Sequence, residues 1–176
     1  LAIDRTNDRL DARAELGVGP ERVFIAVVTG SLGARRVNEA VLGAATRWST
    51  RRDLAIRHVV GSRDWESLQE RLPSTDGLEY VAVRYEDHMD KVLAAADLVI
   101  GRAGGTTANA AALVLVGGAV LINDADLDGD RLADAVEALI SEPDRLHRMG
   151  AAAHTLARPD AADAVAELVE RHARRN

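Results

Sequence analysis

Short apolar runs alternate with helical patterns along the chain. The first run, from Val23 to Val28, is rich in β-branched residues and almost wholly apolar, which is typical of a strand buried on both faces of a parallel sheet. From Ala34 onward, apolar residues recur at helical spacing. Further strands are predicted at residues 54–61, 78–83, 97–101 and 119–122, so we expect five or more parallel strands.

Helices are predicted before, between and after these strands. The patterns place them at residues 4–16, 34–48, 64–72, 87–96, 128–141, 143–157 and 160–174. Asp64 and Asp87 are expected to open their helices, and Pro143 occupies a favourable first-turn position. Strands that alternate with helices predict an α/β fold with a doubly wound, Rossmann-like parallel sheet, whose binding crevice lies at the carboxyl ends of the strands.

The composition fits one domain of this class. With 176 residues and 47% hydrophobic content, the chain is long enough to bury an ordinary core. Aromatic residues make up only 3%, so the core must be built from Ala, Val, Leu and Ile, which favours helices packed on a parallel sheet over a β-sandwich. The net charge of −6, with acidic and basic residues interspersed, argues against a nucleic-acid partner.

The chain lacks cysteine and lacks a long apolar run, which limits its possible locations and kinds of site. Without cysteine, the chain has neither disulfides nor thiolate metal sites, which permits a cytoplasmic location. No apolar run is long enough to span a bilayer. The chain begins at Leu1, without a Met or a signal-peptide pattern, so we expect it to be part of a longer protein whose missing part lies upstream.

The turn after the first predicted strand contains two glycines, Gly30 and Gly33, and leads into a helix. Such a junction exposes free backbone N–H groups in the positive field of the helix terminus, and Ser31 adds a hydroxyl. The turn is therefore a candidate phosphate site. The alternative is a plain strand-to-helix turn that uses glycine for its conformation alone.

A second glycine turn, "GRAGGTT", follows the predicted strand at 97–101. Two such turns on one sheet edge could hold a diphosphate from two sides, with Thr106 and Thr107 as hydroxyl donors, so we favour a nucleotide diphosphate as the ligand. Arg102 could supply charge, although it could equally form a surface ion pair. Between the turns, "RYEDHM" could meet a base through Tyr85 and exposed backbone groups, or could simply start a helix at Asp87.

Other kinds of site find little support. The chain has no P-loop pattern, and "TGSLGA" lacks the third glycine of a dinucleotide fingerprint. His58 falls in a predicted strand and is expected to be structural, whereas the position of His88 leaves its role open. The alternating aspartates of "NDADLDGD" lack the glutamate that ends a calcium loop, so they are interpreted as acidic residues that open a helix. We predict no metal and no cofactor, and assign no catalytic residue.

The motifs occur in an order that resembles a known family. "VTGSLGARRVNEAV", then "RYEDHMDKVLAAADLVIGRAGGTT", then a strand and terminal helices, is similar to the carboxyl-terminal, donor-binding domain of MurG-type UDP-N-acetylglucosamine transferases. The resemblance implies one half of a two-domain GT-B glycosyltransferase that transfers GlcNAc from UDP-GlcNAc to lipid I. The product would be lipid II, made for peptidoglycan by an enzyme peripheral to the inner face of the bacterial cell membrane.

The resemblance also implies site residues. The first glycine loop of the family matches Gly30, Ser31, Leu32 and Gly33, with Thr29 where the family usually has another glycine. The segment that faces the uracil matches Tyr85, Glu86 and Met89, with main-chain groups of Glu86 reading the base. The second phosphate loop matches Arg102, Gly104, Gly105, Thr106 and Thr107. The acidic residue that binds the ribose in the family would fall at Ala110, where it is missing.

The chain departs further from the family after Thr107. A helix, a Gly-x-Pro strand and a His-Gln loop that contacts the sugar are replaced by "ANAAALVLVGGAVLI", so we expect either a break near residues 107–109 or a true deletion. The acceptor site and the catalytic base would belong to the absent amino-terminal domain, so the chain is expected to bind UDP-GlcNAc or UDP without turnover. The alternatives are another GT-B transferase of UDP-sugars and a non-catalytic nucleotide-binding domain.

Overall fold

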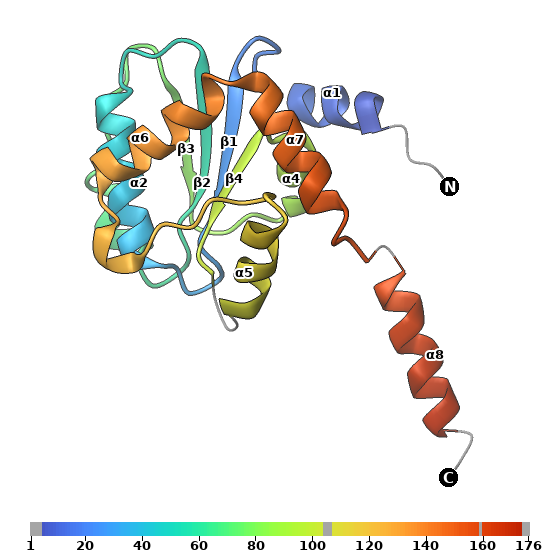
Figure 1. Cartoon of the computed structure of the whole chain (residues 1–176). Helices are drawn as coiled ribbons and strands as arrows, with labels where there is room; N and C mark the ends of the chain where they lie inside the picture. Colours follow the sequence, from blue (N-terminus) through green and yellow to red (C-terminus); the bar gives the residue numbers. More distant parts are fainter. Residues whose placement is uncertain (1–4, 104–106, 159, 174–176) are drawn as a thin grey trace.

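The computed structural model describes residues 5–103, 107–158 and 160–173. Within these residues, four parallel strands form one sheet: β1 (Val23–Val28), β2 (Leu54–Val59), β3 (Glu79–Val83) and β4 (Leu98–Gly101). Their order across the sheet is β3-β2-β1-β4, with Ile25 of β1 paired to Ile56 of β2 and to Leu98 of β4. All four carboxyl ends therefore lie along one edge (Figure 1).

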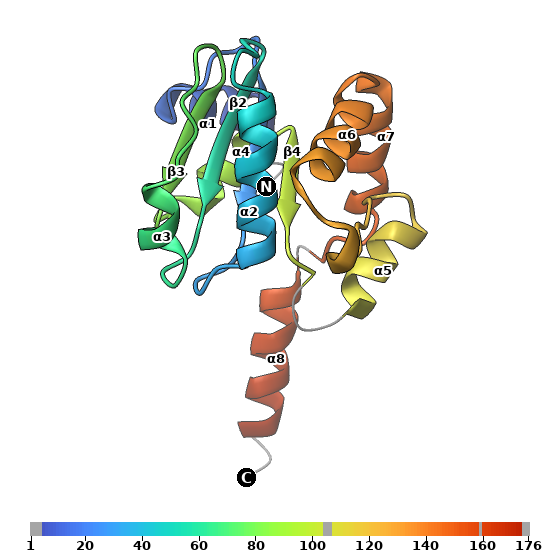
Figure 2. The ribbon, with the colours of Figure 1, turned by 90° about the vertical axis from the view of Figure 1, so that its left-hand side faces the viewer.

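Helices cover both faces of the sheet, as predicted for a doubly wound α/β fold (Figures 1 and 2). Three helices lie on one face: α2 (Arg35–Arg47), α3 (Trp65–Gln69) and α6 (Gly129–Ile140). On the other face lie α1 (Arg5–Glu15) and α4 (Met89–Ala95). Alternate residues of β1 serve the two faces, since Ile25 packs beneath α2 and α6 whereas Phe24 packs beneath α1 and α4.

The last third of the chain is helical. It contains α5 (Thr107–Leu115), a short 3₁₀ helix η1 (Asp124–Asp126), α7 (Pro143–His154) and α8 (Ala161–Ala173). Pro143 begins α7, and Asp128 caps α6 by accepting a hydrogen bond from the Arg131 N–H, as predicted. Helix α8 extends away from the sheet (Figure 1).

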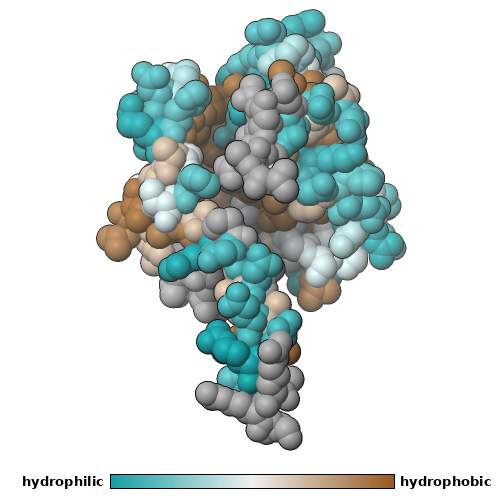
Figure 3. Space-filling model, turned by 90° about the vertical axis from the view of Figure 1, so that its right-hand side faces the viewer, coloured by the Kyte–Doolittle hydropathy of each residue, from teal (hydrophilic) through white to brown (hydrophobic). Residues whose placement is uncertain are grey.

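Apolar side chains are exposed on parts of this last third. They lie on α5, on the segment after it and on α8, and include Val114, Leu115, Val120, Leu121, Val165, Leu168 and Val169. On the face shown in Figure 3, hydrophobic surface also lines a hollow between two hydrophilic parts of the molecule. Exposed apolar surface of this extent is typical of an interaction surface.

The prediction of a fifth strand at residues 119–122 is wrong for the described chain. Ala119 and Ile122 are partly buried, Val120 and Leu121 are exposed, and the segment has no strand assignment. Ile122 packs against the core without joining the hydrogen-bond ladder. A run of four apolar residues does not by itself distinguish a strand from an extended connection, which is why the pattern misled.

The prediction of a break near residues 107–109 stays a prediction, since residues 104–106, just before them, lie outside the described part of the chain. Helix α5 begins at Thr107 and continues without interruption to Leu115. Its residues after Ala110 carry no charge, and the side chains of Val114 and Leu115 are exposed. The unusual pattern after Thr107 therefore corresponds to a single, poorly covered helix.

Candidate functional site

The loops that follow β1, β2 and β3 are joined into one rim at the carboxyl edge of the sheet. The Ser62 N–H donates to the Ser31 carbonyl at 2.9 Å, and the Gly61 N–H donates to the Arg84 carbonyl at 3.1 Å. Ser31 and Glu86, which are both predicted site residues, lie on this rim. Gly105, a predicted site residue of the second glycine loop, lies outside the described residues.

Thr29 ties the start of the first glycine loop to the end of β2. Its Oγ1 lies 2.8 Å from the carbonyl oxygen of Val59 and 2.9 Å from that of Val60, and the side chain is buried. A single hydroxyl hydrogen is thus shared between two carbonyl groups, of which that of Val59 also accepts from the Thr29 N–H at 3.4 Å and that of Val60 from Asn38 Nδ2 at 3.1 Å. The residue that replaces the family's usual glycine therefore fixes this loop to its neighbour.

Gly30 and Gly33 of the first loop have different structural roles. Both have positive φ, +84° for Gly30 and +91° for Gly33, a conformation that other residues rarely adopt. A β-carbon at Gly33 would lie only 2.6 Å from the Val60 carbonyl oxygen, whereas one at Gly30 would have no neighbour within 4 Å. Gly33 is thus required by packing between two loops, and only Gly30 borders open space.

The start of α2 has the features of an anion site. Its N-cap residue, Ala34, provides no side-chain cap, and its first turn has no acidic residue. The first-turn N–H groups, which have no partners within a helix, thus meet neither of the groups that commonly neutralise them. Arg35 and Arg36 add positive charge, but the Arg36 guanidinium also donates to the carbonyls of Leu127 (3.4 Å) and Ala125 (3.2 Å). Arg35 is the more exposed of the two cations, and each lies 3.9 Å from a carboxylate oxygen, Arg35 from Asp64 and Arg36 from Asp124.

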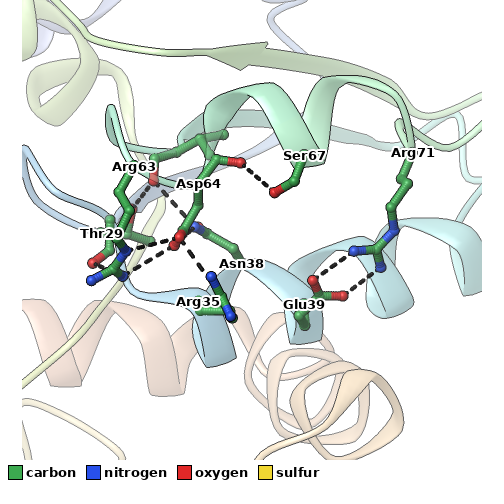
Figure 4. Close-up of polar contacts among 10 residues, drawn as sticks. Thr29, Arg35, Asn38, Glu39, Arg63, Asp64, Ser67 and Arg71 are labelled. Atoms are coloured by element: carbon green, nitrogen blue, oxygen red, sulfur yellow. Dashed lines mark hydrogen bonds and ion pairs between the residues drawn. The ribbon is translucent and has the colours of Figure 1, made fainter.

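Asp64 connects α2 to the loop after β2 (Figure 4). Its carboxylate accepts hydrogen bonds from Asn38 Nδ2 at 3.0 Å and from Arg63 Nε at 3.0 Å, and Arg63 Nη2 also donates to the Gly33 carbonyl at 3.1 Å. The hydrogen bond from Arg63 holds the pKa of Asp64 below its ordinary value. Asp64 occupies the N-cap position of α3, as predicted, but its side chain makes no cap hydrogen bond and accepts from Asn38 instead.

A buried network lies beneath the rim. Asn38 Nδ2 donates to the Val60 carbonyl and to Asp64, so its Oδ1 must accept the hydrogen bond from His58 Nε2, 2.9 Å away. His58 Nδ1 is then an acceptor for the Tyr80 hydroxyl at 2.7 Å. Burial lowers the pKa of His58 to about 4, which keeps the ring neutral. His58 is structural, as predicted.

The predicted base-facing residues after β3 differ in exposure and in position. The Tyr85 side chain is exposed, the Glu86 side chain is buried, and Met89 is the first residue of α4. Met89 packs partly buried against the core cluster beneath α1 and α4. The prediction that Asp87 opens this helix is wrong, since His88 occupies the N-cap position.

Only the beginning of the loop after β4 is described. Arg102 is exposed. Gly104, Gly105 and Thr106 lie outside the described residues, and Thr107 is described only as the start of α5. The first turn of α5 contains no acidic residue, and Ala110 lies within the helix.

A hollow of about 460 Å³ lies beside the first turn of α2. It is lined by Arg35, Arg36, Glu39, Ala40, Leu127, Asp128 and Gly129. A smaller hollow of about 250 Å³ lies at the amino ends of β1 and β2, beside Val23 and Asp53, and is remote from the loops of the rim. The first hollow adds space next to the uncapped start of α2, whereas the second lies at the opposite edge of the sheet.

Sequence reasoning missed the residues that hold the rim together. Thr29, Asn38, Arg63 and Asp64 were not among the predicted site residues, yet they link the loops after β1 and β2 to α2. One signal was available: Asn38 is a polar residue beside the apolar positions of a helix, and such residues usually have a buried partner. The partner itself was not predictable from spacing.

No helix in the described parts of the chain is both long enough and apolar enough to cross a membrane. Among the same residues, no three or more His, Asp or Glu side chains gather as a metal ion would require.

The sequence comparisons with known proteins all find similarity to the same kind of glycosyltransferase. Residues 24–108 match the glycosyltransferase family 28 C-terminal domain. A UDP-N-acetylglucosamine--N-acetylmuramyl-(pentapeptide) pyrophosphoryl-undecaprenol N-acetylglucosamine transferase from a Nocardioides species is 35% identical over 191 residues, which cover 95% of this chain and 52% of the relative. The enzyme of the same name from Acidothermus cellulolyticus is 34% identical, with 97% of this chain and 53% of the relative covered.

The fold has a counterpart among solved structures. MurG from Acinetobacter baumannii superposes with a TM-score of 0.74 over 95% of this chain and 53% of that chain, at 21% sequence identity. The chain spans about half the length of the curated relatives it matches. Because the alignment with the Nocardioides relative covers 191 positions and the chain has 176 residues, that relative contains residues that this chain lacks. Residues 24–108 are thus similar in sequence to the C-terminal domain of the family 28 glycosyltransferases, and the fold of the chain is similar to that of about half of MurG.

Proposed function

We propose that the chain binds UDP-GlcNAc as the donor domain of an N-acetylglucosaminyltransferase. The observation that carries the proposal is the start of α2, which has no side-chain cap and no first-turn acid and lies behind the Gly30–Gly33 loop. An uncapped helix terminus with neighbouring arginines suits a diphosphate, because the N–H groups and the helix dipole both favour negative charge. The relatives from Nocardioides and Acidothermus are named as UDP-N-acetylglucosamine transferases, which agrees with a UDP-sugar as the ligand.

The rim provides a place for each part of the donor. Gly30, Ser31 and Leu32 would contact the diphosphate through their N–H groups and the Ser31 hydroxyl. The uracil would lie against the loop after β3, with the exposed Tyr85 as a neighbour. Arg102 and the second glycine loop, from Gly104 to Thr107, would approach the diphosphate from the other side.

The whole protein would then be an inverting glycosyltransferase that converts lipid I to lipid II at the inner face of the cell membrane. Backbone N–H groups at α2 would stabilise the leaving UDP as its charge develops. The lipid-linked acceptor and the catalytic base would belong to an amino-terminal domain. A non-catalytic nucleotide-binding domain is the second candidate, favoured by Ala110 at the ribose position and by the residues that this chain lacks relative to its relatives.

Affinity for nucleotides tests this proposal on the chain as it stands. UDP is expected to bind about tenfold more tightly than ADP, because backbone groups that pair with a uracil edge would be left without partners against adenine, at about 1–3 kcal/mol for each. Titration calorimetry with UDP, ADP and UDP-GlcNAc measures this difference.

The same titration separates the candidates. Ser31→Ala should weaken UDP and ADP equally, because the Ser31 hydroxyl is assigned to phosphate alone. UDP-GlcNAc binding more tightly than UDP supports a donor domain, whereas equal affinities favour the non-catalytic alternative. Equal affinities for UDP and ADP would contradict the uracil assignment, and no UDP binding at millimolar concentration would contradict the proposal.

A further inference from the structure

The Glu86 carboxylate forms a buried ion pair beneath the loop after β3. Its side chain is only 4% exposed, and Oε2 accepts from both Arg57 Nε and Arg57 Nη2 at 2.7 Å. The other oxygen, Oε1, accepts a hydrogen bond from the His88 N–H at 3.0 Å. One carboxylate thus links three elements, since Arg57 lies in β2, Glu86 in the loop and His88 at the start of α4.

The backbone of this loop has few other restraints. Within the described part of the chain, the N–H and carbonyl groups of Tyr85, Glu86 and Asp87 make no backbone hydrogen bond. Tyr85 and Asp87 are exposed on either side of the buried Glu86. The side chain of Glu86 is therefore what holds the exposed part of the loop in place.

Burying the Arg57–Glu86 ion pair costs desolvation free energy, so the pair is expected to have a role beyond stability. Removing a carboxylate and a guanidinium from water requires good geometry and further hydrogen bonds to compensate, and apolar residues of similar size would often be as stable. Unlike an apolar contact, the pair is directional, because the arginine donors and the His88 N–H each fix one carboxylate oxygen. The gain from the pair is thus a defined loop position.

We infer that Arg57 and Glu86 are positioning residues that hold the loop of residues 84–88 for recognition of a nucleobase. The inference rests on the proposed function, since the base is the part of UDP assigned to this loop. Neither side chain touches the nucleotide. Their effect is transmitted through the main chain of the loop, so it concerns the base and leaves the diphosphate site at α2 unchanged.

Glu86→Gln tests this assignment with an almost isosteric change. The glutamine oxygen can accept from Arg57 or from the His88 N–H, but the amide NH₂ then faces the remaining donor, so the link is broken. UDP affinity is expected to fall at least about tenfold, whereas affinity for inorganic pyrophosphate should change less than about twofold. Both are measured by titration calorimetry, with circular dichroism to confirm that the variant is folded.

Two further variants sharpen the test. Arg57→Lys keeps the charge but cannot provide two donors to one oxygen, so it should lower UDP affinity in the same selective way even if Glu86→Gln fails to fold. Arg145→Met is the matched control, because Arg145 forms an exposed arginine–glutamate pair with Glu142 at the start of α7, outside the loops of the rim. It should leave both affinities unchanged.

The outcomes distinguish this inference from the proposed function. Wild-type chain that fails to bind UDP overturns the proposed function and the inference with it. Wild-type chain that binds UDP, together with folded variants that bind it equally well, overturns the inference alone. Equal losses of UDP and pyrophosphate affinity also overturn it, because the pair would then support the whole rim and not the base.

Discussion

Replacing Asp97 with alanine is expected to lower the free energy of unfolding by about 3–5 kcal/mol, because it leaves a buried arginine without its carboxylate. Asp97 precedes β4, and its Oδ2 accepts from the Phe24 N–H at 2.8 Å and from Arg13 Nη1 at 3.1 Å. The Arg13 side chain is only 5% exposed, and Arg9 forms a second ion pair with Asp97. The carboxylate therefore fastens α1 and the edge strand to β1.

The charge of Asp97 is well stabilised in the folded chain. Burial acts to raise its pKa, but the hydrogen bond from the Phe24 N–H and the ion pairs with Arg9 and Arg13 outweigh it, so the pKa lies below the ordinary value. Urea denaturation of the wild type and the variant measures the loss of stability. Asp53→Ala is the control, because Asp53 pairs with Arg51 but is 54% exposed, and its loss should cost at most about 1 kcal/mol. Equal effects of the two substitutions would contradict the role assigned to Asp97.

Acidification from pH 7 to pH 4 is expected to destabilise the chain by about 3 kcal/mol through His58 alone. Burial lowers the pKa of His58 from 6.5 to about 4, so the unfolded chain takes up a proton more readily than the folded chain. The stability contributed by the neutral ring is complete above pH 6.5 and is lost as the pH falls toward 4. The carboxylates with lowered pKa values, such as Asp64 and Asp97, lose their contributions below that range.

A variant separates His58 from the other titrating groups. His58→Gln should flatten the dependence of unfolding free energy on pH between 6.5 and 4, because glutamine can donate to Asn38 and accept from Tyr80 without titrating. His172→Gln, at an exposed position of α8, should keep the wild-type slope. Urea denaturation at several pH values gives the slopes, and a wild-type slope in His58→Gln would show that another group is responsible.

The predictable parts of the structure are those that depend on local sequence. The run from Val23 to Val28 is apolar at every position, so it predicts a strand buried on both faces, and the structure has β1 with these bounds. Gly30 and Gly33 mark a turn because few other residues adopt positive φ, and both glycines do so. From such elements the parallel sheet and its carboxyl edge follow by the general rules of α/β folds.

The parts that could not be predicted depend on contacts between distant residues. Arg13 and Asp97 are 84 positions apart, and Arg57 and Glu86 are 29 apart. No spacing rule relates such pairs, so Arg13 reads as a surface residue of a polar helix and Glu86 as an exposed loop residue. The strand predicted at residues 119–122 was wrong for a related reason, since an apolar run predicts burial but does not identify a neighbouring strand with which to pair.

The most direct test of the central claim is a titration of the ¹⁵N-labelled chain with UDP, followed by the chemical shifts of its backbone amides. Binding at the rim predicts that the amides of residues 30–36 and 84–88 shift together and saturate with one affinity. Amides beside the hollow at Val23 and Asp53, and those of α8, should stay unchanged. A spectrum without UDP-dependent shifts, or with shifts confined to the opposite edge of the sheet, would contradict the account.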